Sequence, residues 1–355
     1  MYLFFFITFY LLATAIFFNK KNNFYLLITF FIFFLLSALR STNVGNDTSD
    51  YKLLFDNLIY NPISQFTWRY ESGYLYYNKI IQFFTYNSQI LFVVSAAIIC
   101  IGYGILIHEF SDIPWISVYL FFMLRYFDLS MNVLRQSLAM VILFFGFNIL
   151  VKGIKGKYFF YFISVVVLAS FFHGTALVFL MLIFSDRIKS EKRFIVFVSI
   201  LTLICFFSFD IIFNIILKFF PAYFYYMNSS YMDGTTKLAT VLNLLVNVVI
   251  LLFIHFNGYE KNKENKIMFN ALIIGISIMI VSFRFSLLDR MSDFFTVYSI
   301  ILLPNSIYFS RYNSKLSLFF TYILIICFFI YYIVIIVYRP DWNRVYPYEF
   351  FWNYK

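Results

Sequence analysis

Charged residues are scarce in this sequence. Only 12% of the 355 residues are Asp, Glu, Lys or Arg, whereas 63% are apolar. A soluble domain carries about 25% charged residues. The shortage excludes a soluble globular fold, and no segment between the apolar stretches is long enough to fold as a soluble domain of its own.

Cysteine and histidine are also rare, with three of each. Cys100, Cys205 and Cys327 fall inside apolar stretches, too scattered for a metal site and too buried for a disulfide framework. No Walker loop, Rossmann glycine pattern or nucleophile elbow occurs. We therefore predict no metal site and no cofactor, and cytoplasmic ATP or nucleotide-sugar chemistry lacks support.

Long apolar runs recur from end to end, separated by short polar breaks. This pattern is typical of successive bilayer-spanning helices. It predicts an all-α integral membrane protein of about 12 transmembrane helices, in a single polytopic domain over residues 1–355. The expected spans are residues 2–18, 24–39, 89–107, 114–129, 133–151, 158–172, 174–185, 194–217, 238–256, 267–286, 291–309 and 316–337, with a break in the eighth near Asp210.

The basic residues indicate the orientation of these spans. Of the 27 Lys and Arg, 14 lie in six short loops, namely 19–23, 108–113, 152–157, 186–193, 257–266 and 310–315. Compact basic loops are cytoplasmic by the positive-inside rule. Membrane orientation thus explains the net charge of +10 better than nucleic-acid binding does. We predict a multi-pass protein of the bacterial inner membrane with both termini outside.

Three outward segments are long, at 40–88, 218–237 and 339–355. Loops of this size without a domain of their own are usually functional. We therefore expect them to contribute to a site that faces the periplasm.

Polar residues gather in four clusters, all on the predicted outward face. Charged groups near a bilayer cost about 2.5–3.5 kcal/mol each, so they persist where they are paired, hydrated or functional. The spacing of the second cluster predicts that its first four members share one helical face. The clusters are Arg40 with Asp47, Asp50 and Glu71; Arg125, Asp128, Asn132, Arg135 and Gln136; His173; and Arg284, Asp289, Arg290 and Asp293.

These residue types suit chemistry on a phosphate-linked sugar. Guanidinium groups stay charged and bind phosphate oxygens in a bidentate way. A carboxylate or imidazole can act as general base toward a sugar hydroxyl. Structural interpretations remain open: Arg125 could simply pair with Asp128, and His173 could cap a helical hairpin.

At these residues the sequence resembles the EpsG-like, Wzy-type polysaccharide polymerases. The motifs follow one another in the family's order along most of the chain. They are Leu39-Arg40, Val44-Gly45-x-Asp47-x2-Asp50-Tyr51, Glu71-x-Gly73-Tyr74, Asn132-x2-Arg135-Gln136, Ala169-x3-His173, Asp289-Arg290-Met291 and Tyr346-Pro347-Tyr348.

The resemblance implies a C-type glycosyltransferase-like helical bundle with a long outward loop after its second helix. It implies an O-antigen, capsule or exopolysaccharide polymerase, which transfers a growing glycan from undecaprenyl pyrophosphate to the next lipid-linked repeat unit. Donor and acceptor are then both undecaprenyl-pyrophosphate-linked oligosaccharides, among membrane lipids. Whether a chain-length regulator and a flippase also bind is open.

On this basis each cluster receives an expected role. We expect Arg135, Arg284 and Arg290 to bind the pyrophosphate, and His173, or else Asp47 or Asp50, to act as the base. The remaining candidates for substrate binding are Arg40, Glu71, Arg125, Asp128, Asn132, Gln136 and Asp289.

Two other functions compete with a polymerase. A flippase for lipid-linked oligosaccharides should have polar residues along the midplane of several spans and an internal two-fold repeat, and the sequence has neither. An O-antigen ligase would use similar arginines, so the sequence discriminates poorly between it and a polymerase.

Overall fold

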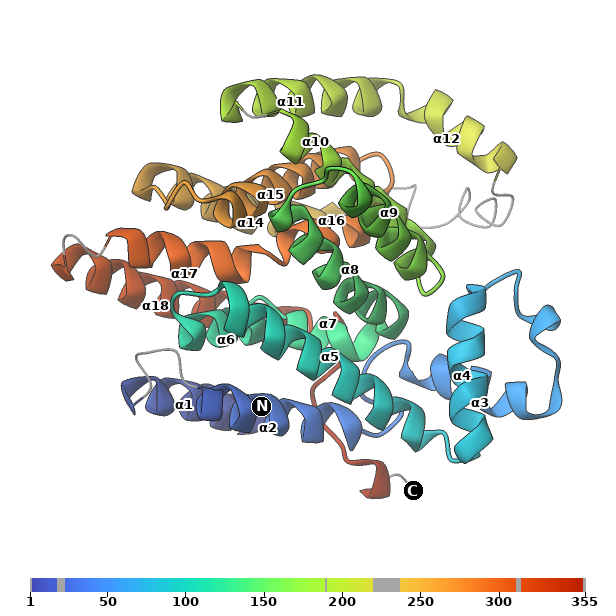
Figure 1. The fold of residues 1–355 in the computed structure, drawn as a ribbon. Helices are drawn as coiled ribbons and strands as arrows, with labels where there is room; N and C mark the ends of the chain where they lie inside the picture. Colours follow the sequence, from blue (N-terminus) through green and yellow to red (C-terminus); the bar gives the residue numbers. More distant parts are fainter. Residues whose placement is uncertain (1, 18–22, 189, 220–236, 311–313, 354–355) are drawn as a thin grey trace. The chain divides into compact units, whose positions relative to one another are not determined.

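The computed structural model describes residues 2–17, 23–188, 190–219, 237–310 and 314–353. These residues form helices and turns without a β-strand, and their one β-type pairing is an isolated bridge between Arg40 and Phe350. The prediction of an all-helical fold is therefore confirmed (Figure 1). The chain divides into two compact units, residues 1–144 with 168–174 and 304–355, and residues 145–167 with 175–303.

The first unit holds both ends of the chain. Three of its helices, α8, α9 and α17, continue into the second unit. Its elements are α1 (Tyr2–Phe17), α2 (Asn23–Ala38), α3 (Thr48–Tyr60), η1 (Ile63–Gln65), α4 (Ser72–Phe84), α5 (Gln89–Phe110), α6 (Pro114–Met123), α7 (Tyr126–Asn132), α8 (Leu134–Lys152), α9 (Lys157–Ser170), α17 (Ser299–Phe309), α18 (Ser314–Tyr338) and η6 (Phe351–Asn353).

Aromatic rings fill the core of the first unit. Phe4 stacks on Tyr332 with ring centroids 4.6 Å apart, and Phe33 lies 4.7 Å from Phe127. These rings join α1 to α18 and α2 to α7. A side chain at Gly102 of α5 would begin 2.6 Å from Val141 of α8, so this glycine lets the two helices approach closely.

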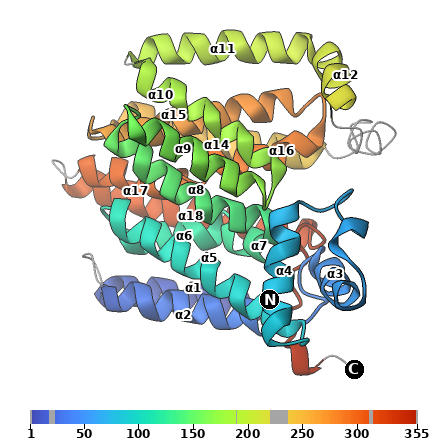
Figure 2. The same cartoon turned by 45° about the vertical axis from the view of Figure 1, so that its right-hand side comes forward.

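The predicted loop 40–88 is itself folded. It contains α3 and α4, which lie side by side in both views (Figures 1 and 2). Gln82 of α4 donates to the carbonyl of Phe55 in α3 at 2.6 Å, and Lys79 donates to the carbonyl of Leu58. The loop is thus a helical platform whose two helices are joined by side-chain to backbone bonds.

The second unit packs around α15, which is buried on most sides. Gly275 of α15 allows α16 to approach, since a Cβ there would lie 2.6 Å from the Thr296 methyl. Besides the shared helices, its elements are η2 (Gly174–Leu182), α10 (Ile183–Arg187), α11 (Glu191–Phe207), α12 (Phe209–Phe219), α14 (Lys237–Asn257), α15 (Lys263–Val281), η4 (Ser286–Leu288) and α16 (Asp289–Thr296).

Several helices have the length and composition of membrane spans. Five described helices are long and apolar enough to cross a bilayer, or six if the bent pair α11 and α12 is one span. Five shorter apolar helices of 10–17 residues accompany them. The chain is therefore a helical membrane protein, and the expected number of about 12 spans remains a prediction.

Some expected spans differ from the observed helices. Residues 174–185 form a 3₁₀ helix followed by the short α10, not an α-helical span. The break expected near Asp210 lies between α11 and α12, which meet at 77°. Apart from its ends, the expected loop 218–237 lies outside the described residues.

Candidate functional site

The start of α4 lies against the turn that follows α9. The backbone N–H of Tyr74 donates to the carbonyl of Phe171 at 3.1 Å. Gly73 makes this approach possible, because a Cβ there would lie 2.7 Å from the same carbonyl oxygen. The close packing brings Glu71, which precedes α4, next to His173.

Glu71 joins two groups that the sequence had placed in separate clusters. Its Oε2 accepts a hydrogen bond from Nη1 of Arg135 at 2.5 Å. Its Oε1 lies 3.4 Å from Nδ1 of His173 and accepts from the backbone N–H of Gly174 at 3.0 Å. We call Glu71, Arg135, His173 and this N–H the Glu71 centre.

Two tyrosines also contact the guanidinium group of Arg135. Its guanidinium lies 5.0 Å from the centre of the Tyr70 ring, within the range of a cation–π contact. It also donates a hydrogen bond to the hydroxyl of Tyr51. Among the described residues, none forms a hydrogen bond with its buried Nε. The centre therefore retains a buried N–H donor that a bound oxyanion could satisfy.

The electrostatics keep Glu71 ionised. Burial alone would raise the pKa of its carboxyl, but the hydrogen bond from His173 and the charge of Arg135 outweigh burial and lower the pKa to about 2. The side chains of Glu71, Arg135 and His173 are 21–25% exposed, so the centre is partly open. A carboxylate this acidic orients and charges its neighbours and does not act as a general base at neutral pH.

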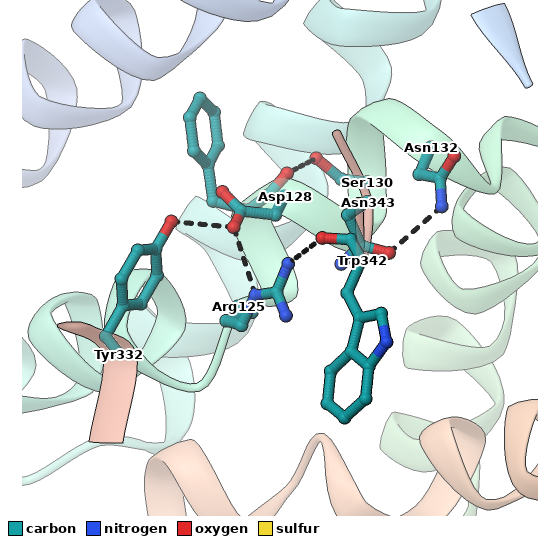
Figure 3. Close-up of polar contacts among 8 residues, drawn as sticks. Arg125, Asp128, Ser130, Asn132, Tyr332, Trp342 and Asn343 are labelled. Atoms are coloured by element: carbon teal, nitrogen blue, oxygen red, sulfur yellow. Dashed lines mark hydrogen bonds and ion pairs between the residues drawn. The ribbon is translucent and has the colours of Figure 1, made fainter. Parts of the chain in front are cut away.

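A second charged group surrounds Asp128 (Figure 3). The side chains of Arg125 and Asp128 are 11% and 2% exposed, so this group is more deeply buried than the Glu71 centre. The Asp128 carboxylate accepts from Nε of Arg125 at 3.2 Å and from the Tyr332 hydroxyl at 2.6 Å. Arg125 also donates to the backbone carbonyl of Trp342. The pairing of Arg125 with Asp128 thus occurs, and the bond from Arg125 to Trp342 fastens the C-terminal tail, residues 339–353, to the start of α7.

Asn132 bridges the tail and the loop after α2. Its Oδ1 accepts from the backbone N–H of Asp47 at 3.2 Å, and its Nδ2 donates to Asn343 at 3.0 Å (Figure 3). Gly45 lies in the left-handed region at φ 91°, and its N–H donates to the carbonyl of Arg344 at 3.0 Å. The tail is thereby bound along the loop that carries Asp47.

The prediction of one helical face for Arg125, Asp128, Asn132 and Arg135 is wrong. Arg125 has a left-handed backbone at φ 67°, and α7 ends before Val133, which separates it from α8. Arg125 therefore precedes α7, Asp128 and Asn132 lie on α7, and Arg135 lies on α8. Arg125 and Asp128 pair with each other, whereas Arg135 faces Glu71.

Arg40 and Gln136 are buried within the first unit. Arg40 is fully buried, donates to the carbonyls of Ser37 and Met131, and lies 4.6 Å from the centre of the Phe92 ring. Burial lowers the pKa of Arg40 to about 10, so it stays charged at neutral pH. In this arrangement Arg40 organises the loop, and substrate binding by Arg40 or Gln136 stays a prediction.

The two aspartates proposed as alternative bases differ from His173 in their surroundings. Asp50 is half exposed and forms an ion pair with Arg69 at 3.1 Å. Asp47 lies at the N-terminus of α3. Of the three candidates, only His173 lies in the Glu71 centre.

The remaining candidates belong to the second unit. Arg284 donates to Asp210 at 2.5 Å on an exposed surface. Asp289 accepts from Asn243 at 2.9 Å, and burial raises its pKa to about 6 despite that bond and the nearby charge of Arg290. That Arg135 meets Arg284 and Arg290 in one pocket remains a prediction.

Several contributing residues carried no clear signal in the sequence. Tyr70 and Tyr332 are two among 30 tyrosines, and Tyr51 was quoted only as part of a motif. Gly73 was part of a quoted motif, but only the fold shows that it packs on Phe171. Within the described part of the chain, no three His, Cys, Asp or Glu side chains are grouped to hold a metal ion.

The apolar helices and the charged centre between helix ends define an integral membrane protein with a polar site built from separate segments. The chain belongs to the EpsG family, whose model it matches over residues 23–350. The match confirms the resemblance seen in the motifs and indicates a polymerase-like role in polysaccharide biosynthesis. No curated protein and no solved structure matches the chain significantly.

Proposed function

We propose that this protein is a polysaccharide polymerase. It transfers a growing glycan from its undecaprenyl pyrophosphate onto the next lipid-linked repeat unit, at the periplasmic face of the inner membrane. The observation that carries the proposal is the Glu71 carboxylate, which holds Arg135 at 2.5 Å and lies 3.4 Å from Nδ1 of His173. Membership in the EpsG family supports the same reaction class.

His173 acts as the general base in this proposal. With its Nδ1 proton directed to Glu71, a neutral imidazole has its lone pair on Nε2 and can accept a proton there. The 3.4 Å separation is long for a hydrogen bond. Such bonds are often long without substrate and tighten when it binds.

The reaction balances without an oxidant or a nucleotide. The acceptor hydroxyl gives its proton to Nε2 of His173, and its oxygen attacks the anomeric carbon of the donor glycan. The bond from that carbon to the pyrophosphate oxygen breaks, and the lipid pyrophosphate leaves with the electron pair. Arg135 stabilises the developing anion, which is a form of electrostatic catalysis. Pyrophosphate binding by Arg284 and Arg290 is part of the same proposal.

The test is polymerisation by the purified protein in lipid nanodiscs, with its lipid-linked repeat unit as the sole substrate. The wild type should form dimers and longer products. His173→Ala and Arg135→Ala should lose at least about 10²-fold in rate, as expected when a base or an anion-stabilising donor is removed. Full-length ladders from both variants would refute the assignment.

Matched controls are available elsewhere in the chain. His255 at the end of α14 and Arg187 at the end of α10 are both exposed. His255→Ala and Arg187→Ala should retain activity. Deletion of the gene distinguishes the competing functions, since a lost polymerase leaves single repeat units on the final lipid acceptor, whereas a lost ligase or flippase leaves none.

A further inference from the structure

One helix outside the candidate spans carries an uncovered apolar face. Along α4, Tyr76, Ile80, Phe83 and Phe84 are 60–85% exposed. Their spacing of four, three and one residues places them on one stripe of the helix. These are the kinds of side chain that a water-facing helix avoids.

The opposite face of α4 is fixed, so the stripe cannot turn inward. Tyr74, Asn78 and Ile81 are buried there. The bonds from Gln82 and Lys79 to carbonyls of α3 hold the helix in this orientation. The apolar stripe therefore faces away from the rest of its unit.

The connection to α5 sets the level of α4 relative to the bilayer. Only residues 85–88 separate the two helices, and four residues span at most about 14 Å. The α5 helix has 22 residues and is a candidate membrane span. The Gln89 side chain at its start donates to the carbonyls of Ala38 and Arg40 at 2.6 and 3.2 Å, so α5 begins where α2 ends.

We infer that α4 lies along the membrane surface, with Tyr76, Ile80, Phe83 and Phe84 at the boundary between lipid headgroups and acyl chains. Aromatic residues are enriched at this depth, and an amphipathic helix binds there by burying its apolar face. On α5 itself, Ile98, Ile101 and Ile105 are also exposed, as expected for a helix that contacts lipid.

This placement goes beyond the proposed function, because it would hold whether or not the protein polymerises sugars. Its consequence for the site is geometric. Since Glu71 directly precedes α4, a helix held on the lipid surface keeps the Glu71 centre at a fixed height above the bilayer. The headgroup of a lipid-linked molecule arrives at that height.

The experiment uses nitroxide labels on single cysteines of the full-length protein in phospholipid nanodiscs. Cys205 and Cys327 are replaced by Ala, and Cys100 is kept because it is buried. Labels are placed at Ile80 and Phe83, with Tyr76 as a third position on the same face in case one label disturbs folding. Collision rates with oxygen, which partitions into lipid, and with a water-soluble nickel chelate are then compared.

Two exposed positions calibrate the measurement. Ile101 in the middle of α5 represents lipid, and Ser49 beside the Asp50–Arg69 ion pair represents water. We expect the oxygen-to-nickel ratio at Ile80 and Phe83 to exceed that at Ser49 several-fold and to approach that at Ile101. A ratio equal to that at Ser49 would overturn the inference. Low collision rates with both reagents would overturn it as well, because they would show that protein, such as a second copy, covers the stripe.

Discussion

Replacement of Gly73 by Ala should move Glu71 away from His173 and Gly174 without changing any side chain of the Glu71 centre. The added methyl would lie 2.7 Å from both the Cβ and the carbonyl oxygen of Phe171. Ordinary contact begins at 3.4 Å, so the start of α4 has to move by about 0.7 Å. The obstacle includes backbone, which cannot swing aside as a flexible side chain would.

The displacement is large on the scale of the site. Moving Glu71 away by the same amount would lengthen its 3.0 Å bond to the Gly174 N–H beyond hydrogen-bond range and widen its 3.4 Å separation from His173. A misplacement of about 1 Å can cost about 10²-fold in rate. We expect Gly73→Ala to lose about 10- to 100-fold in polymerisation, with a destabilisation of about 1–3 kcal/mol from overpacking.

The assay is the rate of product formation in nanodiscs, normalised to folded protein from size-exclusion chromatography and thermal melting. Gly104→Ala in α5 is the matched control, because its Cβ would meet only the Phe30 ring at 3.5 Å. That variant should keep its activity. It should gain up to about 1 kcal/mol in stability, since Ala is the better helix former. Near-normal polymerisation by folded Gly73→Ala would refute the argument that the rate depends on the distance between Glu71 and His173.

The remaining predictions concern single charged groups. Arg135→Lys keeps the charge but loses the planar fork, so we expect about a 10²-fold lower rate with normal expression, and activity within a few-fold of wild type would contradict this. Because the pKa of Glu71 is lowered, its ionised carboxylate stabilises the folded state by at most about 3 kcal/mol at pH values above 4.5, its ordinary pKa. This contribution is lost as the pH falls toward 2. The difference in melting temperature between wild type and Glu71→Gln should therefore shrink from pH 6 to pH 3. Arg284→Ala and Asp210→Ala should each change stability by less than about 1 kcal/mol, because their ion pair is exposed. Only Arg284→Ala should slow polymerisation, and equal rates from both variants would exclude pyrophosphate binding by Arg284. Asp128→Ala should lower stability by about 3–5 kcal/mol in thermal melts, since it leaves the charge of Arg125 buried without its carboxylate.

The sequence predicted the helical membrane fold well because apolar runs leave the backbone no other choice in lipid. It failed where a helix breaks without a breaker residue. The stretch from Leu124 to Leu134 contains neither Gly nor Pro, yet the helix expected over residues 114–129 ends at Met123, and the chain turns at Arg125. Tertiary contacts, such as the bond from Arg125 to the tail, act there in place of a local signal.

The sequence identified the charged residues of the candidate site, but it did not show which of them contact one another. Glu71 is 64 residues from Arg135 and 103 from Gly174, so no local spacing could join them. All three side chains of the centre were nevertheless singled out, because each is a charged or titratable group on the predicted outward face. A charge next to lipid needs a partner or a ligand, and the fold lets these groups meet that need together.

The same reasoning explains why the supporting tyrosines received no expected role. Tyr51, Tyr70 and Tyr74 carry no charge, and they occur in a chain in which 25% of the residues are aromatic. Their importance comes from position alone: Tyr70 lies over the Arg135 guanidinium, and Tyr51 binds it. In a membrane protein, a pattern of charges can therefore reveal which residues need an interaction partner. Only the packing shows which of many similar aromatic rings is that partner. In this chain Gly73 determines that Glu71 and His173 meet, because it lets α4 pack on the backbone that carries His173.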